Sequence, residues 1–123
     1  MPSYYYEDFN AGDEWTYDPW VIEEESLVEF ATKYDPQPMH TDAAAAADGP
    51  YGALIASGWQ TALNCVSPFL DDIMKDTAGL ASPGFEVFQW LKPVPVDSPV
   101  VPTTTVLGKR LSKSKPGIGL VQF

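Results

Sequence analysis

The chain has 123 residues, a length that fits one domain with a single hydrophobic core. Hydrophobic residues make up 45% of it, which excludes a disordered chain, and no apolar run is long enough to span a membrane. The formal net charge of −10 argues against binding to nucleic acid or to an anionic membrane surface, because both require basic patches.

Two further compositional features concern location and ligand class. The N-terminus lacks the basic and apolar regions of a signal peptide, so we expect a cytoplasmic protein, and the single cysteine, Cys65, excludes an internal disulfide. Cys65 lies in an apolar helical pattern, where a buried hydrophobe is a better interpretation than a nucleophile. Residues 86–123 carry five basic and two acidic side chains, a local charge of +3 that suits either a phosphorylated ligand or a solvated strand edge.

The first half of the chain reads as one strand followed by helices. Alternation predicts a strand over residues 14–17, which the Asp-Pro step at 18–19 ends. Acidic residues followed by apolar residues at spacings of three and four predict a helix from Glu23 that ends at the next Asp-Pro step, 35–36. Thr41 is the predicted N-cap of a short alanine helix over residues 43–47.

The longest helical pattern follows residue 52 and is the predicted core helix. Its core stripe is expected to contain six apolar residues: Trp59, Ala62, Leu63, Val66, Leu70 and Ile73. Pro68 predicts a kink or break near residues 64–68, because its ring clashes with the carbonyl group of Asn64.

The second half of the chain changes to a period of two. Residues 85–91 are apolar on both faces and predict a central strand, and two more strands are expected over residues 103–111 and 119–123, joined by a polar turn at 112–117. One strand, then helices, then several strands favours an α+β domain with a helix packed on an antiparallel sheet. No internal repeat is visible, so we expect a single domain over residues 1–123.

Residues 34–41 contain the only histidine of the chain. The two prolines of Tyr-Asp-Pro-Gln-Pro-Met-His-Thr predict an ordered turn that holds Asp35 and His40 in a defined geometry. A carboxylate and an imidazole on such a turn are suited to share a water molecule and to exchange protons with it, although either group alone also fits a structural role.

Four stretches of the chain resemble the MaoC-like dehydratases, a family that includes the (R)-specific enoyl-CoA hydratases and has the hot-dog fold. They are Tyr-Tyr-Glu-Asp-Phe at 5–9 with Gly-Asp at 12–13, Asp-Pro-Gln-Pro-Met-His at 35–40, Leu-Ile-Ala-Ser-Gly-Trp at 54–59, and Ser-Pro-Gly at 82–84 with Trp-Leu-Lys-Pro-Val at 90–94. The resemblance implies a long central helix wrapped by an antiparallel sheet. Gln37 stands where the hydratases usually have Asn.

The resemblance also implies roles for particular residues. Asp35 and His40 would be the acid/base pair that activates the water, with their individual roles left open, and the backbone N–H of Gly58 would polarise the thioester carbonyl. Three further residues would contact the substrate: Gln37, Ser57 and Trp59.

The implied reaction is the hydration of a trans-2-enoyl thioester of CoA or acyl carrier protein, or the reverse dehydration of a 3-hydroxyacyl thioester. The family's assembly implies a homodimer that shares its active site, in which basic side chains of residues 92–115 reach the ligand's phosphates. No metal or redox cofactor is expected, because the chain has neither a cluster of metal ligands nor a glycine-rich phosphate loop.

Two departures from the family keep other functions open. The segment 93–99 is rich in proline, and the chain ends at Phe123 before the sheet of the family is complete, so we expect either a truncated sequence or a second subunit over the exposed edge. The alternatives are a hot-dog thioesterase and a non-catalytic subunit that binds acyl thioesters or takes part in assembly.

Overall fold

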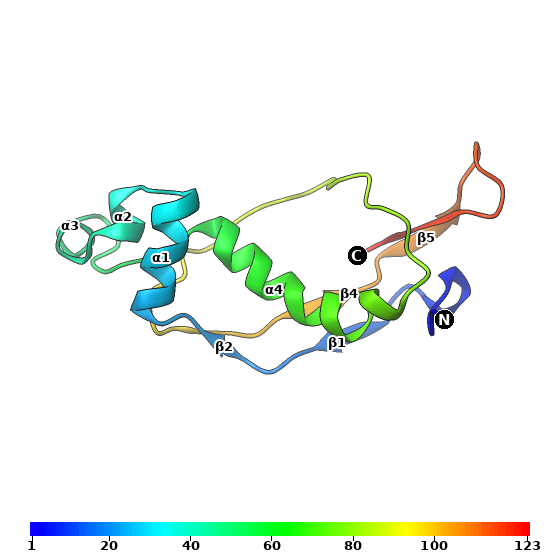
Figure 1. Ribbon diagram of the computed structural model, residues 1–123, viewed down its shortest axis with the longest axis horizontal. Coiled ribbons are helices and arrows are strands. Elements are labelled where there is room, and N and C mark those ends of the chain that lie inside the picture. The colour runs from blue at the N-terminus through cyan, green and yellow to red at the C-terminus, as the bar shows by residue number, and fades with distance from the viewer. The chain divides into compact units, whose positions relative to one another are not determined.

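The computed structural model describes residues 1–123 and shows a mixed α+β chain (Figure 1). In chain order the elements are the 3₁₀ turn η1 (Tyr6–Asp8), β1 (Glu14–Thr16), β2 (Trp20–Val21), α1 (Glu24–Tyr34), α2 (Pro38–Thr41), α3 (Ala43–Ala47), α4 (Gly58–Asp72), the 3₁₀ turn η2 (Met74–Asp76), β3 (Pro99–Val100), β4 (Thr103–Thr105), β5 (Gly108–Leu111) and β6 (Gly119–Gln122). None of the helices is both long and apolar enough to cross a bilayer.

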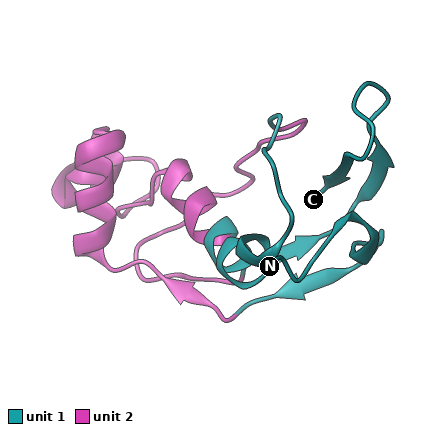
Figure 2. Cartoon of the chain, turned by 45° about the vertical axis from the view of Figure 1, so that its right-hand side comes forward, with its two compact units in different colours: residues 1–17, 66–84, 102–123 teal, residues 18–65, 85–101 magenta.

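The chain forms two compact units, which Figure 2 shows in different colours. Unit 1 comprises Met1–Tyr17, Val66–Gly84 and Pro102–Phe123, and unit 2 comprises Asp18–Cys65 and Phe85–Val101. Each unit has its own cluster of buried hydrophobic side chains. Both units are therefore described separately below.

Unit 1 is built on two antiparallel strand pairs. β1 pairs with β4, with Trp15 opposite Thr104, and β5 pairs with β6. The threonines of β4 suit a strand because their branched side chains pack well on a pleated surface. Four buried residues form the core of this unit: Phe9, Phe69, Ile73 and Val106.

The strand predicted over residues 103–111 is two strands, because the chain changes partners in the middle. The N–H of Val106 donates to the carbonyl of Asp13 at 2.8 Å, whereas the N–H of Leu107 donates to that of Gln122 at 2.8 Å. β4 therefore pairs with β1, and β5 pairs with β6. The predicted strands at 14–17 and 119–123 are confirmed within one residue at their ends.

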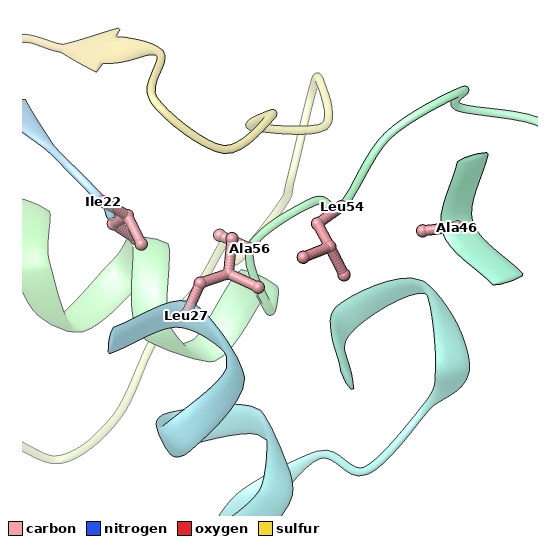
Figure 3. Close-up of a cluster of buried hydrophobic side chains, with 5 residues drawn as sticks. All are labelled: Ile22, Leu27, Ala46, Leu54 and Ala56. Carbon is pink, nitrogen blue, oxygen red and sulfur yellow. The ribbon is translucent and has the colours of Figure 1, made fainter. Parts of the chain in front are cut away.

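Unit 2 is organised around α1. This helix begins with two acidic residues, ends at Tyr34 before the Asp-Pro step as predicted, and buries Leu27 and Ala31 one turn apart. Leu27 packs in a cluster of five buried hydrophobic side chains that Figure 3 shows: Ile22, Leu27, Ala46, Leu54 and Ala56. This cluster joins α1, α3 and the segment that leads into α4.

The predicted N-cap of the alanine helix is wrong. Asp42, not Thr41, caps α3, since Asp42 Oδ1 accepts a hydrogen bond from the N–H of Ala45 at 3.0 Å. Thr41 ends α2, a single helical turn within the predicted ordered segment, and its hydroxyl donates to the carbonyl of Gln37 at 3.2 Å. A hydroxyl bonded one turn back along its own helix does not cap the next helix.

α4 differs from the prediction in two respects. The helix continues through Pro68 without a break. Four residues of the predicted core stripe are exposed, namely Trp59, Leu63, Val66 and Leu70, whereas Ile73 is buried as predicted. The buried side of the helix carries Gln60 and Phe69, and Ile73 is buried directly after the helix ends at Asp72. Packing of Phe69 and Ile73 in the core of unit 1, beyond the proline, offsets the backbone hydrogen bond that Pro68 removes.

The central strand predicted over residues 85–91 is also wrong for this chain. The segment is not a strand, and its large apolar side chains are exposed, with Phe85 at 78%, Val87 at 72% and Leu91 at 86%. A segment with alternating side chains forms a strand only where a neighbouring backbone supplies hydrogen-bond partners, and residues 85–91 are part of none of the sheets of the chain. The antiparallel pair of β2 with β3 was not predicted, because both strands are only two residues long and adjoin prolines.

Candidate active site

Asp35 and His40 lie beside each other in unit 2. Asp35 follows the last residue of α1, and Pro36 prevents the helix from continuing, while Pro38 begins the single turn of α2 that carries His40. His40 Nε2 lies 3.5 Å from Asp35 Oδ2. The side chain of His40 is only 5% exposed and that of Asp35 is 18% exposed, so the pair is largely shielded from water.

The backbone of Ile55 determines which nitrogen of His40 carries a proton. His40 Nδ1 lies 2.7 Å from the carbonyl oxygen of Ile55, which can only accept, so Nδ1 is the donor. The N–H of Ile55 in turn donates to the carbonyl of Met39 at 3.1 Å. Nε2 is therefore the nitrogen that faces Asp35.

Asp35 accepts one hydrogen bond on each carboxylate oxygen. Gln37 Nε2 donates to Oδ1 at 2.7 Å, and Ser57 Oγ donates to Oδ2 at 2.7 Å. The hydrogen bond from Gln37, followed by that from Ser57 and by the nearby imidazole of His40, lowers the pKa of Asp35 below its ordinary value of 3.8, against the opposing effect of burial. Asp35 is therefore ionised at neutral pH.

Gly58 is the first residue of α4. Its backbone N–H has no acceptor in the chain, since the first hydrogen bond into this helix runs from Thr61 N–H to the carbonyl of Ser57 at 3.1 Å. A Cβ atom at position 58 would collide with the indole ring of Trp90. Glycine is therefore required here by a close approach, and the helix presents a free donor at this point.

A cavity of about 450 Å³ connects these groups within unit 2. Asp35, Gln37, His40 and Gly58 line it together with aromatic side chains, among them Trp59 and Trp90. His40, Tyr51 and Lys92 are the titratable side chains that share the cavity with Asp35. The arrangement offers a proton-exchanging pair, a backbone donor and apolar walls, which suits a small electrophile attached to an apolar group.

The cavity contains five of the six site residues predicted from the sequence. Ser57 does not line it but is completely buried behind Asp35. The prediction missed the Ile55 carbonyl, for which no side-chain signal exists, and Trp90, which lies in a segment predicted as a strand. Nowhere in the chain do three or more His, Cys, Asp or Glu side chains lie close enough to hold a metal ion. Burial raises the pKa of the Cys65 thiol, as expected for an unreactive cysteine.

Comparison with known families supports the same interpretation. The model of the MaoC like domain matches residues 9–120. The chain belongs to the MaoC-like family. The MaoC-like dehydratase of Rhodospirillum rubrum is similar to it in structure with a TM-score of 0.83 and 32% identity, over 94% of this chain and 79% of that one.

Two further solved structures share the fold of this MaoC-like chain. The monoamine oxidase regulatory protein of Archaeoglobus has a TM-score of 0.85 at 22% identity, over 98% of this chain and 79% of that one. The (R)-hydratase PhaJ1 of Pseudomonas aeruginosa has a TM-score of 0.70 at 24% identity, over 85% of this chain and 66% of that one. The predicted α+β hot-dog fold is confirmed.

Proposed function

We propose that this MaoC-like protein hydrates trans-2-enoyl thioesters, or dehydrates 3-hydroxyacyl thioesters in the reverse direction. One observation carries the proposal: a single cavity brings the Asp35–His40 pair together with the unpaired N–H of Gly58. Hydration of an enoyl thioester needs these two elements, namely proton transfer at one face and a donor to the oxygen of the developing enolate. The (R)-hydratases among the structures of the same fold support this choice.

The proposed proton path starts with Asp35 ionised and with a proton on His40 Nε2. Asp35 is ionised and takes a proton from water as the hydroxyl oxygen bonds to C3 of the enoyl group, while the N–H of Gly58 stabilises the thioester oxygen. His40 Nε2 then gives its proton to C2, and the proton held by Asp35 returns to His40 across the 3.5 Å that separates them. The product gains one water, and both side chains recover their starting states.

Substrate binding is proposed from the walls of the cavity. Trp59, which stacks on Phe88 with a centroid distance of 5.5 Å, provides a flat apolar surface for the acyl chain. Ser57, which was expected to contact the substrate, is buried and instead supports Asp35 from behind. Lys92 is the cation at the cavity and fits the phosphates of CoA or of an acyl carrier protein. Lys109 is engaged elsewhere, because it donates to the carbonyl of Tyr6 at 3.2 Å.

We further propose that the active form is a homodimer. Residues 85–91 expose five large apolar side chains: Phe85, Val87, Phe88, Trp90 and Leu91. Residues 87–91 belong to no sheet of the chain, and a second copy would supply both a neighbouring strand and an apolar cover. Trp90 and Lys92 belong to the cavity wall, so dimerisation would order that side of the site.

The test of the activity uses crotonyl-CoA, with loss of the enoyl absorbance and release of free thiol followed in parallel. We expect the enoyl absorbance to fall without thiol release. Asp35→Asn and His40→Gln should each lower kcat roughly 100-fold or more, since each removes a proton-transfer group without changing the size of the side chain greatly. Asp71→Asn, which removes an exposed carboxylate near the C-terminal end of α4, is the matched control and should retain wild-type activity.

The other outcomes distinguish the alternative functions. Thiol release without hydration would identify a thioesterase. Saturable binding of crotonyl-CoA with neither loss of the enoyl absorbance nor release of thiol would identify a non-catalytic acyl-thioester binder. Undiminished hydration in both Asp35→Asn and His40→Gln would overturn the assignment of the pair.

A further inference from the structure

Gln37 occupies a position between the two proton-transfer groups. Its side chain and its backbone contact different members of the pair: Gln37 Nε2 donates to Asp35 Oδ1 at 2.7 Å, and the Gln37 carbonyl accepts from the N–H of His40 at 2.9 Å. A single residue thus links the carboxylate to the first turn of the helix that carries the imidazole. No other residue of the site bonds both halves of the pair.

The local backbone limits how this link can vary. Pro36 and Pro38 flank Gln37 and fix their own φ angles, and the N–H of Gln37 donates to the carbonyl of Asp35 at 2.8 Å, which closes a three-residue turn around Pro36. Within such a turn the side chains of residues 35 and 37 lie close together. The length of the glutamine side chain allows its amide to reach back to the carboxylate.

The hydrogen bond fixes the orientation of the Gln37 amide through one of its two N–H groups. One N–H of the Gln37 amide is directed at a charged acceptor, and hydrogen bonds to ions are shorter and stronger than those between neutral groups. Ordering an exposed glutamine side chain costs conformational entropy, which a bond to a carboxylate offsets better than a bond to water does. One N–H of the amide is thereby engaged by Asp35 in the free protein.

We propose that Gln37 is a positioning residue for the Asp35–His40 pair, which orients the Asp35 carboxylate through its side chain instead of binding the substrate. The inference rests on the proposed function for its catalytic consequence, but the contact itself is a property of the free protein. Ser57 holds the other carboxylate oxygen, so the two donors together fix the plane of the carboxyl group. The lone pair directed at His40 Nε2 then has one orientation.

The test compares Gln37→Met, which keeps the length but lacks the donor, with Gln37→Glu, which replaces the donor by a second carboxylate. The first measurement is a ¹³C-carboxyl NMR titration of Asp35 in the free protein, with the resonance assigned from Asp35→Asn. We expect the pKa of Asp35 to rise in Gln37→Met and to rise further in Gln37→Glu, because the carboxylate loses a donor and then gains a like charge. Asn10→Leu, which removes an exposed side-chain amide away from the cavity, should leave the titration unchanged.

The second measurement is the steady-state hydration of crotonyl-CoA. We expect kcat to fall roughly tenfold or more in Gln37→Met with KM within about twofold of wild type, as for a group that acts through the catalytic carboxylate. A raised KM at unchanged kcat would instead show a substrate contact and overturn the inference, as would an unchanged Asp35 titration in both variants. If the wild-type protein does not hydrate crotonyl-CoA, the proposed function fails, while the NMR titration still decides whether Gln37 holds Asp35.

Discussion

Ser57 donates a part-buried hydrogen bond to Asp35, and the energetic effect of this bond depends on pH. Ser57 is completely buried, and the pKa of Asp35 in the folded protein lies below the ordinary value of 3.8. A depressed carboxyl pKa contributes stability above the unfolded-state value, and that contribution is lost as the pH falls through the folded-state value. The folded protein is therefore stabilised by the ionised form of Asp35 at neutral pH and loses this term in acid.

Ser57→Ala tests this linkage. We expect the free energy of unfolding to fall by about 1–3 kcal/mol near neutral pH, because a buried hydrogen bond to a charged group is lost. The difference from wild type should shrink as the pH falls from 3.8 through the lower pKa that Asp35 has in the folded protein, below which the carboxyl group is protonated in both states. Urea unfolding across this range measures it, with exposed Ser67→Ala as the control; a difference that does not vary with pH would contradict the linkage.

At the residue scale, the sequence was informative where side chains carry the chemistry. The two prolines around Gln37 were sufficient to predict an ordered segment that brings Asp35 and His40 together. The contact that selects the protonated nitrogen of His40 comes from a backbone carbonyl, and the identity of Ile55 gives no sign of it. Such a contact depends on the path of the chain, so residue types alone cannot predict it.

At the scale of elements, the capping of α3 offers a direct test. Five alanines have high helix propensity but form a helix of a single turn, so the N-cap contributes a large share of its stability. Asp42→Ala removes the side-chain acceptor for the N–H of Ala45 and should lower the free energy of unfolding by about 1 kcal/mol, measured by thermal or urea denaturation. Asp48→Ala removes an acidic residue at the opposite end of α3, where it opposes the helix dipole, and should be neutral or slightly stabilising.

The end of α1 was predicted correctly, whereas the buried side of α4 and the structure of residues 85–91 were not. α1 ends where Pro36 requires, because that rule acts between neighbours. The exposed side of α4 and the irregular segment 85–91 both reflect which surfaces the rest of the chain covers. Periodic apolar residues indicate that one face of an element packs against other atoms, but they do not show whether those atoms belong to the same chain.

At the scale of the whole molecule, the exposed segment 85–91 predicts self-association. Light scattering coupled to size exclusion should give twice the mass of one chain, and Val87→Glu should shift the protein toward the monomer, because it places a charge among exposed apolar side chains. Ser114→Glu, in the polar turn between β5 and β6, adds the same charge elsewhere and should leave the mass unchanged. A monomeric wild-type protein would contradict the prediction.

The way Ile55 holds the histidine has a consequence for engineering. Two backbone contacts of Ile55 position His40. The N–H of Ile55 donates to the carbonyl of Met39, and the carbonyl of Ile55 accepts from His40 Nδ1. Ile55 also lines the cavity. A smaller apolar side chain at this position keeps the backbone groups that fix the imidazole and enlarges the cavity. If the proposed function holds, Ile55→Val should therefore change the preferred length of the acyl chain and leave the proton chemistry in place.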